Sequence, residues 1–578
     1  MSRAQDLFRV WTTDPAFDTA TRAELLAVKD DPVEIEDRFY MDMAFGTAGL
    51  RGVIGAGTNR MNRYTVAKAS EGFARFLAAQ GDVVKNKGIV ISFDSRRYSK
   101  EFALQTALIF IGHGVKVFLS DELRPVPVLS FAIRLLSAAG GVMITASHNP
   151  AKYNGYKVYG EDGGQLPPDA AEVVSLSISE ITDPARLTWP DEKTARQTGL
   201  LIDIGPELDD AYTAMLMKLS INQAAVLRNK SMKIVYTPLH GAGNKPVRRI
   251  LQTIGFENVL VVPEQEMPDP AFPTVAFPNP EERTALEMAI RLAEKENADL
   301  VIATDPDADR TGLCVRTRSG EYLVLSGNQI GLLLMEYILA ARQASGTLPA
   351  NSFTITSIVS TKLTRRIAAA YGVTLFECLT GFKFIAELIK EHDEDGDMHF
   401  QFGFEESFGY LAGRDVRDKD AVVTSMLIAE MAAAARDRGL TLYDLLQEIY
   451  QRYGFCGEKT IAITLEGKEG IDRITAGMQA MRREKAAGIA GVPVLAVKDY
   501  LMKERLDLVT CETSPLTLAE SDVLLYEMAG LDWFCVRPSG TEPKIKIYFG
   551  VYGSNQEDCD RRLEELRGVV EEHIRAKL

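Results

Sequence analysis

GVMITASHNPAKYNGYKVYG, residues 141–160, is the stretch of this 578-residue chain that decides its fold and its chemistry. Residues 142–144 are apolar and have the length of a buried strand. The polar loop that follows, residues 145–150, carries a hydroxyl group at Ser147 and ends at Pro150, which prevents direct continuation as a helix. The pattern predicts a strand that delivers a hydroxyl group to the end of a sheet.

Two further polar groups lie close to that hydroxyl in the sequence. His148 is its neighbour, and Lys157 follows after Asn154-Gly155, a pair that is typical of a turn. A serine at the end of a buried strand, with an ammonium group nearby, can accept a transferred group. A plain turn, whose Ser, His and Asn side chains satisfy local backbone groups, accounts for the same residues. The rest of the chain has to decide between these interpretations.

A repeated unit indicates the fold class. A strand, a polar loop, a helix, a glycine and a second strand follow one another in residues 88–119, 233–262 and 354–376. This order is typical of a βαβ unit with parallel strands. Three copies predict three similar α/β domains with mixed, mostly parallel sheets, in which ligands bind at the loops that follow the strands.

The C-terminal part of the chain has a different character. Its expected elements are a strand, an amphipathic helix, two further strands and a charged helix, in residues 460–465, 470–485, both sides of 537–544, and 555–576. These predict a smaller C-terminal α+β domain with an antiparallel sheet. We therefore expect four domains, in residues 1–205, 206–325, 326–452 and 453–578.

Two segments do not belong to these units. Residues 1–40 predict two short amphipathic helices, over 4–11 and 18–28. Residues 263–280 contain six prolines and predict an extended, ordered loop without helix or strand.

Composition and charge narrow the class of protein. A net charge of −15 argues against general affinity for nucleic acid or for an anionic membrane, so an anionic substrate needs a local basic pocket. Six cysteines without a CxxC pair indicate reduced thiols. The N-terminus lacks the apolar core of a signal peptide, and the most apolar run, residues 330–341, is interrupted by Glu336. We expect a cytoplasmic protein with no nucleic-acid and no membrane partner.

An acidic loop follows the apolar strand at residues 300–303. Asp305, Asp307 and Asp309 stand at alternate positions, and two carboxylates about 4 Å apart repel by roughly 4 kcal/mol at an effective dielectric of 20. A cation removes this repulsion, and oxygen ligands suit Mg²⁺, Ca²⁺ or Mn²⁺. A solvated turn is the simpler alternative. An EF-hand is excluded, because it would need glycine in place of Arg310.

Two other loops have the residues of anion sites. FGTAGLRG, residues 45–52, places three glycines around Arg51, which lets backbone N–H groups and a guanidinium approach an anion. RPSGTEPK, residues 537–544, offers a guanidinium, two hydroxyls and an open glycine backbone to a phosphate. Either segment alone is equally compatible with an ordinary hairpin loop.

The segment GFEESFG, residues 403–409, suits a ligand with several hydroxyl groups. A glutamate accepts hydrogen bonds from two sugar hydroxyls at once, and Glu405 and Ser407 are the candidates. Thr380-Gly381 precedes this segment, and Lys419 follows it in the string RDKD. As isolated strings these are unspecific.

In their order along the chain these segments resemble the motifs of the α-D-phosphohexomutases, the phosphoglucomutase and phosphomannomutase superfamily. The matching strings are TASHNP with NGYK, FGTAGLRG, DPDADR, GFEESFG and RPSGTEPK. They extend over nearly the whole chain, and the FGTAGLRG and DPDADR forms are most similar to the longer phosphoglucomutase/phosphopentomutase subgroup. Pro306 replaces the glycine usual in the family's metal loop, which requires a negative φ there but leaves the ligands in place. Gly409 stands where some members have histidine.

The resemblance implies a role for each matching residue. The implied catalytic residues are Ser147, as phosphoserine, His148, Lys157, Arg51, Arg310 and Lys419. The implied ligands of Mg²⁺ are Asp305, Asp307, Asp309 and a phosphoserine oxygen of Ser147. The implied substrate-binding residues are Thr380, Gly381, Glu405, Ser407, Arg537, Ser539, Gly540 and Thr541.

The resemblance also implies a reaction. It is the interconversion of glucose 1-phosphate and glucose 6-phosphate through a phosphoserine enzyme and a bisphosphorylated sugar, with glucose 1,6-bisphosphate as activator and the protein as a monomer or dimer. Mannose or pentose phosphates remain alternative substrates, and either Lys157 or His148 assists proton transfer. A metal-dependent phosphatase and a catalytically silent sugar-phosphate-binding protein are the rivals; the intact Ser147 and Lys157 weigh against the silent one.

Overall fold

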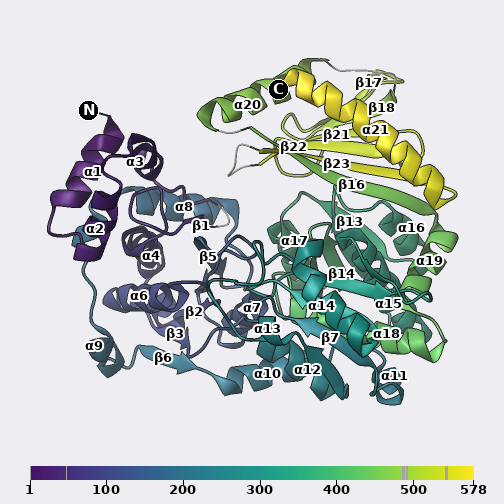
Figure 1. Ribbon diagram of the computed structural model, residues 1–578, viewed down its shortest axis with the longest axis horizontal. Helices are drawn as coiled ribbons and strands as arrows, with labels where there is room; N and C mark the ends of the chain where they lie inside the picture. Colours follow the sequence, from purple (N-terminus) through teal and green to yellow (C-terminus); the bar gives the residue numbers. More distant parts are fainter. Residues whose placement is uncertain (1, 47–48, 466, 485–487, 490–491, 540–543) are drawn as a thin grey trace.

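The computed structural model describes residues 2–46, 49–465, 467–484, 488–489, 492–539 and 544–578. These residues form four β-sheets with helices packed against them (Figure 1). The first three sheets mix parallel and antiparallel strands, whereas the strand pairs described in the fourth are antiparallel. The predicted α/β fold class, with a C-terminal domain of different topology, is confirmed. Each sheet lies within one of the four predicted ranges, whose exact limits stay a prediction.

The first sheet has the strand order β1-β5-β4-β2-β3-β6. Its strands are β1 (Leu50–Val53), β2 (Ile89–Phe93), β3 (Val117–Ser120), β4 (Gly140–Ile144), β5 (Tyr153–Gly160) and β6 (Leu201–Ile204). The crossover helices α6 (Ser99–Gly112) and α7 (Val126–Leu135) connect β2 to β3 and β3 to β4, so these strands are parallel, as is β6 to β3. β5 is antiparallel to β4 and to β1. Since Phe93 is paired with Ile144, the loops after β2 and β4 start side by side.

The second and third sheets repeat this plan. Their orders are β11-β10-β9-β7-β8 and β13-β12-β14-β15. The strands are β7 (Lys233–Thr237), β8 (Asn258–Val261), β9 (Leu300–Thr304), β10 (Thr311–Arg316), β11 (Tyr322–Val324), β12 (Ser352–Ser357), β13 (Thr374–Cys378), β14 (His399–Glu405) and β15 (Gly409–Ala412). The crossover helices α12 (Asn244–Ile254) and α16 (Leu363–Tyr371) stop at Gly255 and Gly372, whose φ angles of 121° and 65° favour glycine.

The fourth sheet has the order β16-β23-β22-β21-β18-β19-β20, with β17 paired to β18. Its strands are β16 (Phe455–Thr464), β17 (Gly488–Ile489), β18 (Val492–Asp499), β19 (Glu504–Asp507), β20 (Thr513–Pro515), β21 (Leu524–Met528), β22 (Trp533–Pro538) and β23 (Lys544–Gly553). Two helices, α20 (Gly467–Glu484) and α21 (Gln556–Lys577), accompany it, and Figure 1 shows α21 lying across the sheet.

The N-terminal segment folds into three helices where the sequence predicted two. They are α1 (Arg3–Thr13), α2 (Thr19–Ala27) and α3 (Pro32–Phe39). The additional helix begins at Pro32, and the Asp31 carboxylate before it accepts two backbone hydrogen bonds of its first turn. This Asp-Pro pair is an N-terminal helix signal that the sequence analysis passed over. Trp11, Phe17 and Phe39 anchor the three helices in one small core.

Two other predictions from the sequence are wrong in detail. Asn154-Gly155 is part of β5 and makes no turn. Glycine is needed there because a Cβ atom would lie 2.5 Å from the carbonyl oxygen of Thr145, so the close approach of two backbones explains it. The proline-rich segment 263–280 contains a short helix, α13 (Pro263–Glu266), because proline is well suited to a first helical position.

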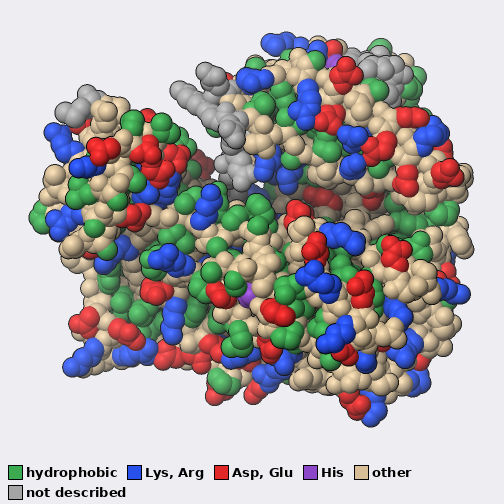
Figure 2. Space-filling model, viewed as in Figure 1, with side chains coloured by type: hydrophobic (Ala, Val, Ile, Leu, Met, Phe, Trp, Pro, Cys, Tyr) green, Lys and Arg blue, Asp and Glu red, His purple; other side chains and the backbone are tan. Residues whose placement is uncertain are grey.

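One hydrophobic cluster runs through the first three sheets and reaches one face of the fourth. It contains Val90, Met143, Ile234, Ile302 and Phe404. A separate cluster, which includes Val536 and Ile545, packs between the fourth sheet and its helices. The surface has a hollow between the N-terminal helices and the C-terminal sheet (Figure 2). Acidic and basic side chains are both present at this hollow. The helices described are all too short or too polar to cross a membrane.

Candidate active site

The loop after β4 presents Ser147 to the loop after β9. The Thr145 hydroxyl donates to Asp94 Oδ2 over 2.6 Å, and the backbone N–H of Ser147 donates to Thr145 Oγ1 over 2.9 Å. Ser147 has a φ of 51°, in the left-handed region that serine seldom adopts. In this conformation its hydroxyl donates to Asp305 Oδ2 over 2.7 Å. The nucleophile candidate is thus held in an unusual backbone conformation and directed at the acidic loop.

A buried arginine, Arg96, supports the loop that carries Ser147. It was not among the site residues predicted from the sequence. Its guanidinium donates to the carbonyl oxygens of Ser147 and Asn149, each over 2.5 Å, and of Pro150 over 3.0 Å. Asp94 pairs with it at 3.3 Å. The available signal was the polar loop 94–99 after the first predicted strand, because the loops after parallel neighbours meet at one edge.

The acidic loop brings three buried carboxylates together. One oxygen each of Asp305, Asp307 and Asp309 lie within 4.8 Å of one another. Asp305 Oδ1 accepts the backbone N–H groups of Asp309 and Arg310, which fixes the loop. Burial raises the pKa of Asp305 well above its usual range, and the charges of Asp307 and Asp309 raise it further.

These residues fit a divalent cation. The Oδ1 atoms of Asp307 and Asp309 are buried and, among the described residues, have no hydrogen-bond partner. A buried, unpaired carboxylate oxygen is costly, and a cation with oxygen ligands satisfies it. The donor set contains no thiol and no imidazole, which favours Mg²⁺, Mn²⁺ or Ca²⁺ over zinc.

Two lysines from other domains neutralise the acidic loop. Lys157 of β5 has its Nζ 2.8 Å from Asp307 Oδ2 and 3.3 Å from Asp309 Oδ2. Lys419 has its Nζ 3.2 Å from Asp309 Oδ2 and 3.0 Å from Asp418 Oδ1. Burial works against the charged form of Asp309, but Lys419 and Lys157 outweigh it and hold its pKa below the usual value. Loops of three sheets therefore meet at one charged centre.

Gly409 makes the path of Lys419 possible. A Cβ atom at Gly409 would lie 2.2 Å from Lys419 Cδ and 2.8 Å from its Cγ. The ammonium group of Lys419 lies over the ring of Phe382, 5.3 Å from the centroid. The stem of the lysine thus occupies the space of the side chain that Gly409 lacks. The close contact with Lys419 explains why this chain has glycine where some members of the similar family have histidine.

His148 and Arg51 lie on the other side of Ser147. His148 Nδ1 is 3.2 Å from Ser147 Oγ, and Arg51 Nη1 donates to Asn149 Oδ1 over 3.1 Å. Burial, reinforced by the charges of Arg310 and Arg51, holds the pKa of His148 well below its usual value. The imidazole is therefore neutral at physiological pH.

Arg310 is held by a residue that the sequence analysis did not single out. Its guanidinium forms an ion pair with Glu281, which directly follows the proline-rich segment. Burial opposes the charged form of Arg310, but Glu281 and Asp309 raise its pKa above the usual value. The proline-rich segment was the only feature of the sequence that pointed to Glu281. It ends directly before Glu281, which pairs with Arg310 beside the acidic loop.

The sugar-loop candidates lie at the end of the third sheet. Glu405 Oε1 accepts the backbone N–H of Gly381 over 2.7 Å, so these two are in contact, with Thr380 adjacent. Ser407 lies in the turn between β14 and β15 and is partly exposed. Burial, followed by the charge of Glu406, raises the pKa of Glu405 to about 7. A carboxyl group with little water around it is suited to accept hydrogen bonds from a polyol.

The phosphate-loop candidates lie on a separate wall. Arg537 of β22 is paired with Lys546 of β23, and the backbone N–H of Ser539 donates to the carbonyl of Lys544 over 2.7 Å. Gly540 and Thr541 lie outside the described residues. Burial lowers the pKa of Lys546, while the charges of Glu406 and Glu281 act on it in the other direction. Lys546, the cross-strand partner of Arg537, is thus influenced by Glu406 of the sugar loop and by Glu281.

Comparison with known families and proteins accounts for this arrangement. Three family models match, described as phosphoglucomutase/phosphomannomutase alpha/beta/alpha domains I, II and III, at residues 42–184, 210–320 and 326–453. A phosphoglucomutase of Staphylococcus aureus (strain bovine RF122 / ET3-1) is 40% identical over 92% of this chain and 94% of its own.

Two solved structures share the fold. Parafusin, a phosphoglucomutase from Paramecium in its open form, has a TM-score of 0.67 at 17% identity and is matched over 92% of this chain and 95% of its own. The Aspergillus fumigatus N-acetylphosphoglucosamine mutase, solved with GlcNAc-6P and magnesium, has a TM-score of 0.50 at 12% identity and is matched over 99% of both chains. Sequence and fold together show that the chain belongs to the phosphoglucomutase/phosphomannomutase family of phosphosugar mutases.

Proposed function

We propose that this enzyme interconverts glucose 1-phosphate and glucose 6-phosphate by phosphoryl transfer to and from Ser147. The observation that carries the proposal is the hydrogen bond of 2.7 Å from Ser147 Oγ to Asp305 Oδ2, in a buried set of three carboxylates. A hydroxyl group in that position is the group to which a phosphoryl group would be attached. The S. aureus relative, 40% identical, is named a phosphoglucomutase, which favours glucose phosphates among the possible substrates.

The acidic loop would hold Mg²⁺. Asp305, Asp307 and Asp309 supply carboxylate oxygens, and phosphorylated Ser147 would add one more ligand. When bound, the ion offsets negative charge on the transferring group. A phosphoserine adds nearly two negative charges, and Lys157 and Arg310 are the cations placed to balance them.

Proton transfer at the reacting hydroxyl has two candidates. His148 lies 3.2 Å from Ser147 Oγ and is neutral, so it can accept a proton there. Lys157 is bound to two carboxylates, and although burial opposes its charged form, Asp307 and Asp309 raise its pKa. We infer that Lys157 acts as a fixed cation that offsets negative charge, and that His148 exchanges the proton with the serine oxygen.

Substrate orientation would come from the other two loops. Glu405, with Ser407, Thr380 and Gly381, would hold ring hydroxyls at the end of the third sheet. Arg537, Ser539, Gly540 and Thr541 would hold the phosphate that is not reacting. Because Ser147 is the single acceptor, a bisphosphorylated intermediate has to turn end for end. Some would escape in the turn, so glucose 1,6-bisphosphate is expected to act as an activator that restores phosphoserine.

Incubation with glucose 1-phosphate and Mg²⁺ tests the proposal. Glucose 6-phosphate as the product supports a mutase, and inorganic phosphate as the product supports the rival phosphatase. No conversion, even after addition of glucose 1,6-bisphosphate, contradicts both. Values of kcat/KM for glucose, mannose and ribose 1-phosphates, measured side by side, decide the preferred sugar. A lag that glucose 1,6-bisphosphate abolishes, most clearly in dephosphorylated protein, supports the escape of the intermediate.

A further inference from the structure

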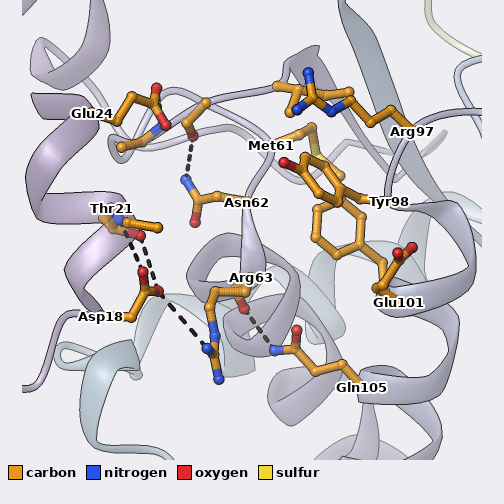
Figure 3. A pocket seen from close by; sticks show the side chains of 15 residues that line it. Asp18, Thr21, Glu24, Met61, Asn62, Arg63, Arg97, Tyr98, Glu101 and Gln105 are labelled. Carbon is orange, nitrogen blue, oxygen red and sulfur yellow. Dashed lines mark hydrogen bonds and ion pairs between the residues drawn. The ribbon is translucent and has the colours of Figure 1, made fainter. Parts of the chain in front are cut away.

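A second pocket lies outside the serine and acidic loops. It has a volume of about 620 Å³, within the range of small-molecule sites, and lies between α2 and the start of α6 (Figure 3). The family models begin at residue 42, so the wall formed by α2 belongs to a part of the chain that they do not describe. The rest of the lining, in residues 54–63 and 97–105, lies within the first family model.

The wall on the α2 side is rigid and its charges are already used. Asp18 accepts hydrogen bonds from the backbone and the hydroxyl of Thr21 and from the hydroxyl of Tyr64. Glu24 accepts hydrogen bonds from Arg38 Nη1 over 2.6 Å and from the backbone N–H of Ala56. These carboxylates have no need of a ligand cation, and they oppose a ligand with several negative charges.

The opposite wall carries charges that the protein leaves available. Arg97 has its guanidinium over the ring of Tyr98, 5.0 Å from the centroid, and no carboxylate of the described residues is paired with it. Glu101, one turn further along α6, likewise has no ion pair within the described part of the chain. Figure 3 shows Arg97, Tyr98 and Glu101 together on this side of the pocket. One unpaired cation and one unpaired carboxylate suit a ligand with one anionic group and several hydroxyls.

Tyr98 adds a flat apolar surface. Tyr98 is 40% exposed. Its ring lies against the ring of Phe102, with 5.8 Å between the two centroids. Its φ of 66° is in the left-handed region, which costs energy for tyrosine, and Tyr98 is the N-cap residue of α6. An exposed aromatic ring beside a guanidinium and a carboxylate matches the C–H face, the phosphate and the hydroxyls of a phosphorylated sugar.

We propose that this pocket is a second binding site for a sugar monophosphate, distinct from the active site. Arg97 would bind the phosphate, Glu101 would accept from sugar hydroxyls, and Tyr98 would lie against the ring. A nucleoside diphosphate or triphosphate fits less well, because its additional charges would face Asp18 and Glu24. The proposal rests on the chemistry of this pocket and not on the proposed reaction at Ser147.

The site is connected to the serine loop by two consecutive residues. The carbonyl of Arg97 accepts a hydrogen bond of 2.9 Å from Asn154 Nδ2, and Arg96 holds the carbonyls of Ser147 and Asn149. A ligand bound to Arg97 therefore contacts the segment that positions Ser147.

Equilibrium dialysis of the full-length protein with glucose 6-phosphate tests the proposal. We expect two molecules bound per chain in the wild type. Arg97→Ala should raise the dissociation constant of one site at least tenfold and leave the other unchanged, since a charge-assisted hydrogen bond is lost. Lys100→Ala, an exposed cation of α6 that does not line the pocket, is the matched control and should bind two. Tyr98→Asn removes the ring but tolerates the left-handed φ, and should weaken the same site.

The outcomes separate this site from the active site. Arg537→Ala should weaken binding of the other molecule by about tenfold or more. A change in Arg97-dependent binding alone and a change in Arg537-dependent binding alone therefore report on different proposals. One molecule per chain in the wild type, with binding unchanged in Arg97→Ala and Tyr98→Asn, would overturn the second site. Binding of adenosine monophosphate that depends on Arg97, with no such binding of glucose 6-phosphate, would overturn its assignment to sugars.

Discussion

The buried serine–metal centre that we propose, Ser147 with the three aspartates, and the proposed phosphate-binding strand end at Arg537 are built in opposite ways. Ser147 is 4% exposed and the three aspartates are fully buried or nearly so, tied together by side chains from three sheets. Arg537 is half-buried at the end of β22, on a domain whose outer layer has a hydrophobic core of its own. Under the proposed reaction the difference has a physical reason. The reacting atoms would need a fixed environment, whereas the group that holds the distant phosphate would have to accept a sugar in two orientations.

The largest effect is expected from Ser147→Ala. Without the acceptor oxygen no phosphoenzyme forms, so kcat should fall by about 10³-fold or more while the fold persists. Intact mass of the freshly purified wild type should show a fraction heavier by one phosphoryl group, which the variant lacks. Near-normal turnover in this variant would remove the serine–metal centre from the reaction.

Asp307→Asn should separate chemistry from stability. The carboxylate lies beside Asp305 and Asp309, and Lys157, its ion-pair partner, keeps Asp309 in the variant. The neutral analogue should therefore lower kcat by about 10²-fold and shift the Mg²⁺ dependence without lowering the melting temperature. Activity as a function of Mg²⁺ concentration and a thermal melt in its absence are the measurements. Full activity with the same Mg²⁺ requirement would contradict the metal assignment.

Gly409→Ala tests whether Lys419 depends on the glycine. The added Cβ atom would displace the lysine stem, and we expect kcat to fall by roughly 10- to 100-fold. Lys419→Ala should cost as much, and the double variant should cost no more than either single one. Gly568→Ala, where the added atom meets open space on α21, is the control and should leave the rate unchanged. Additive losses would show that the two residues act independently.

Arg537→Ala should act on binding more than on chemistry. It removes a phosphate donor away from the reacting centre, so KM for glucose 1-phosphate should rise by about tenfold or more, with a smaller fall in kcat. Steady-state kinetics with both substrates measure this. An unchanged KM with a collapsed kcat would place Arg537 at the reacting phosphate and erase the contrast between the two regions.

The smallest effect on turnover is expected from Asp420→Asn, at the N-terminus of α18 (Ala421–Asp437). The carboxylate accepts the backbone N–H groups of Val422 and Val423, yet burial raises its pKa to about 6. Since the folded state holds the proton more tightly than the unfolded state, the wild type should lose stability relative to the variant as pH rises from about 4 to about 6. The loss is at most about 3 kcal/mol, and it is constant above this window.

A second helix cap gives the control for that prediction. Asp191 caps α9 (Glu192–Gln197), and its hydrogen bonds to the backbone and side chain of Thr194 lower its pKa. Asp191→Asn should therefore show the opposite sign, with the wild type gaining relative stability as pH rises through the range in which Asp191 ionises. Melting temperatures of both variants from about pH 2 to about pH 8 check the two signs, since the window of Asp191 lies below about pH 4 and that of Asp420 above it. The same sign for both would contradict burial as the cause at Asp420.

The elements of the fold could be predicted from local patterns. The strands β2, β7 and β12 and the helices α12 and α16 occur in the predicted order within residues 88–119, 233–262 and 354–376, because apolar runs and glycine stops are local signals. The short helices α3 and α13, each of which begins at a proline, were not predicted. Asn154-Gly155 was wrongly predicted to be a turn. Glycine is needed there because the backbone carbonyl of Thr145 lies close to it.

In the candidate site, too, some features follow from the sequence and others from the tertiary structure. The sequence alone determined which residues carry hydroxyl, carboxylate and guanidinium groups at the ends of strands, and it identified the family through their order. Only the tertiary structure decided that Lys419 reaches Asp309 through the space left by Gly409, that Arg96 holds the serine loop, and that Glu281 pairs with Arg310. The physical reason is that strand ends follow from local periodicity, whereas contacts between loops of different sheets depend on how the domains pack.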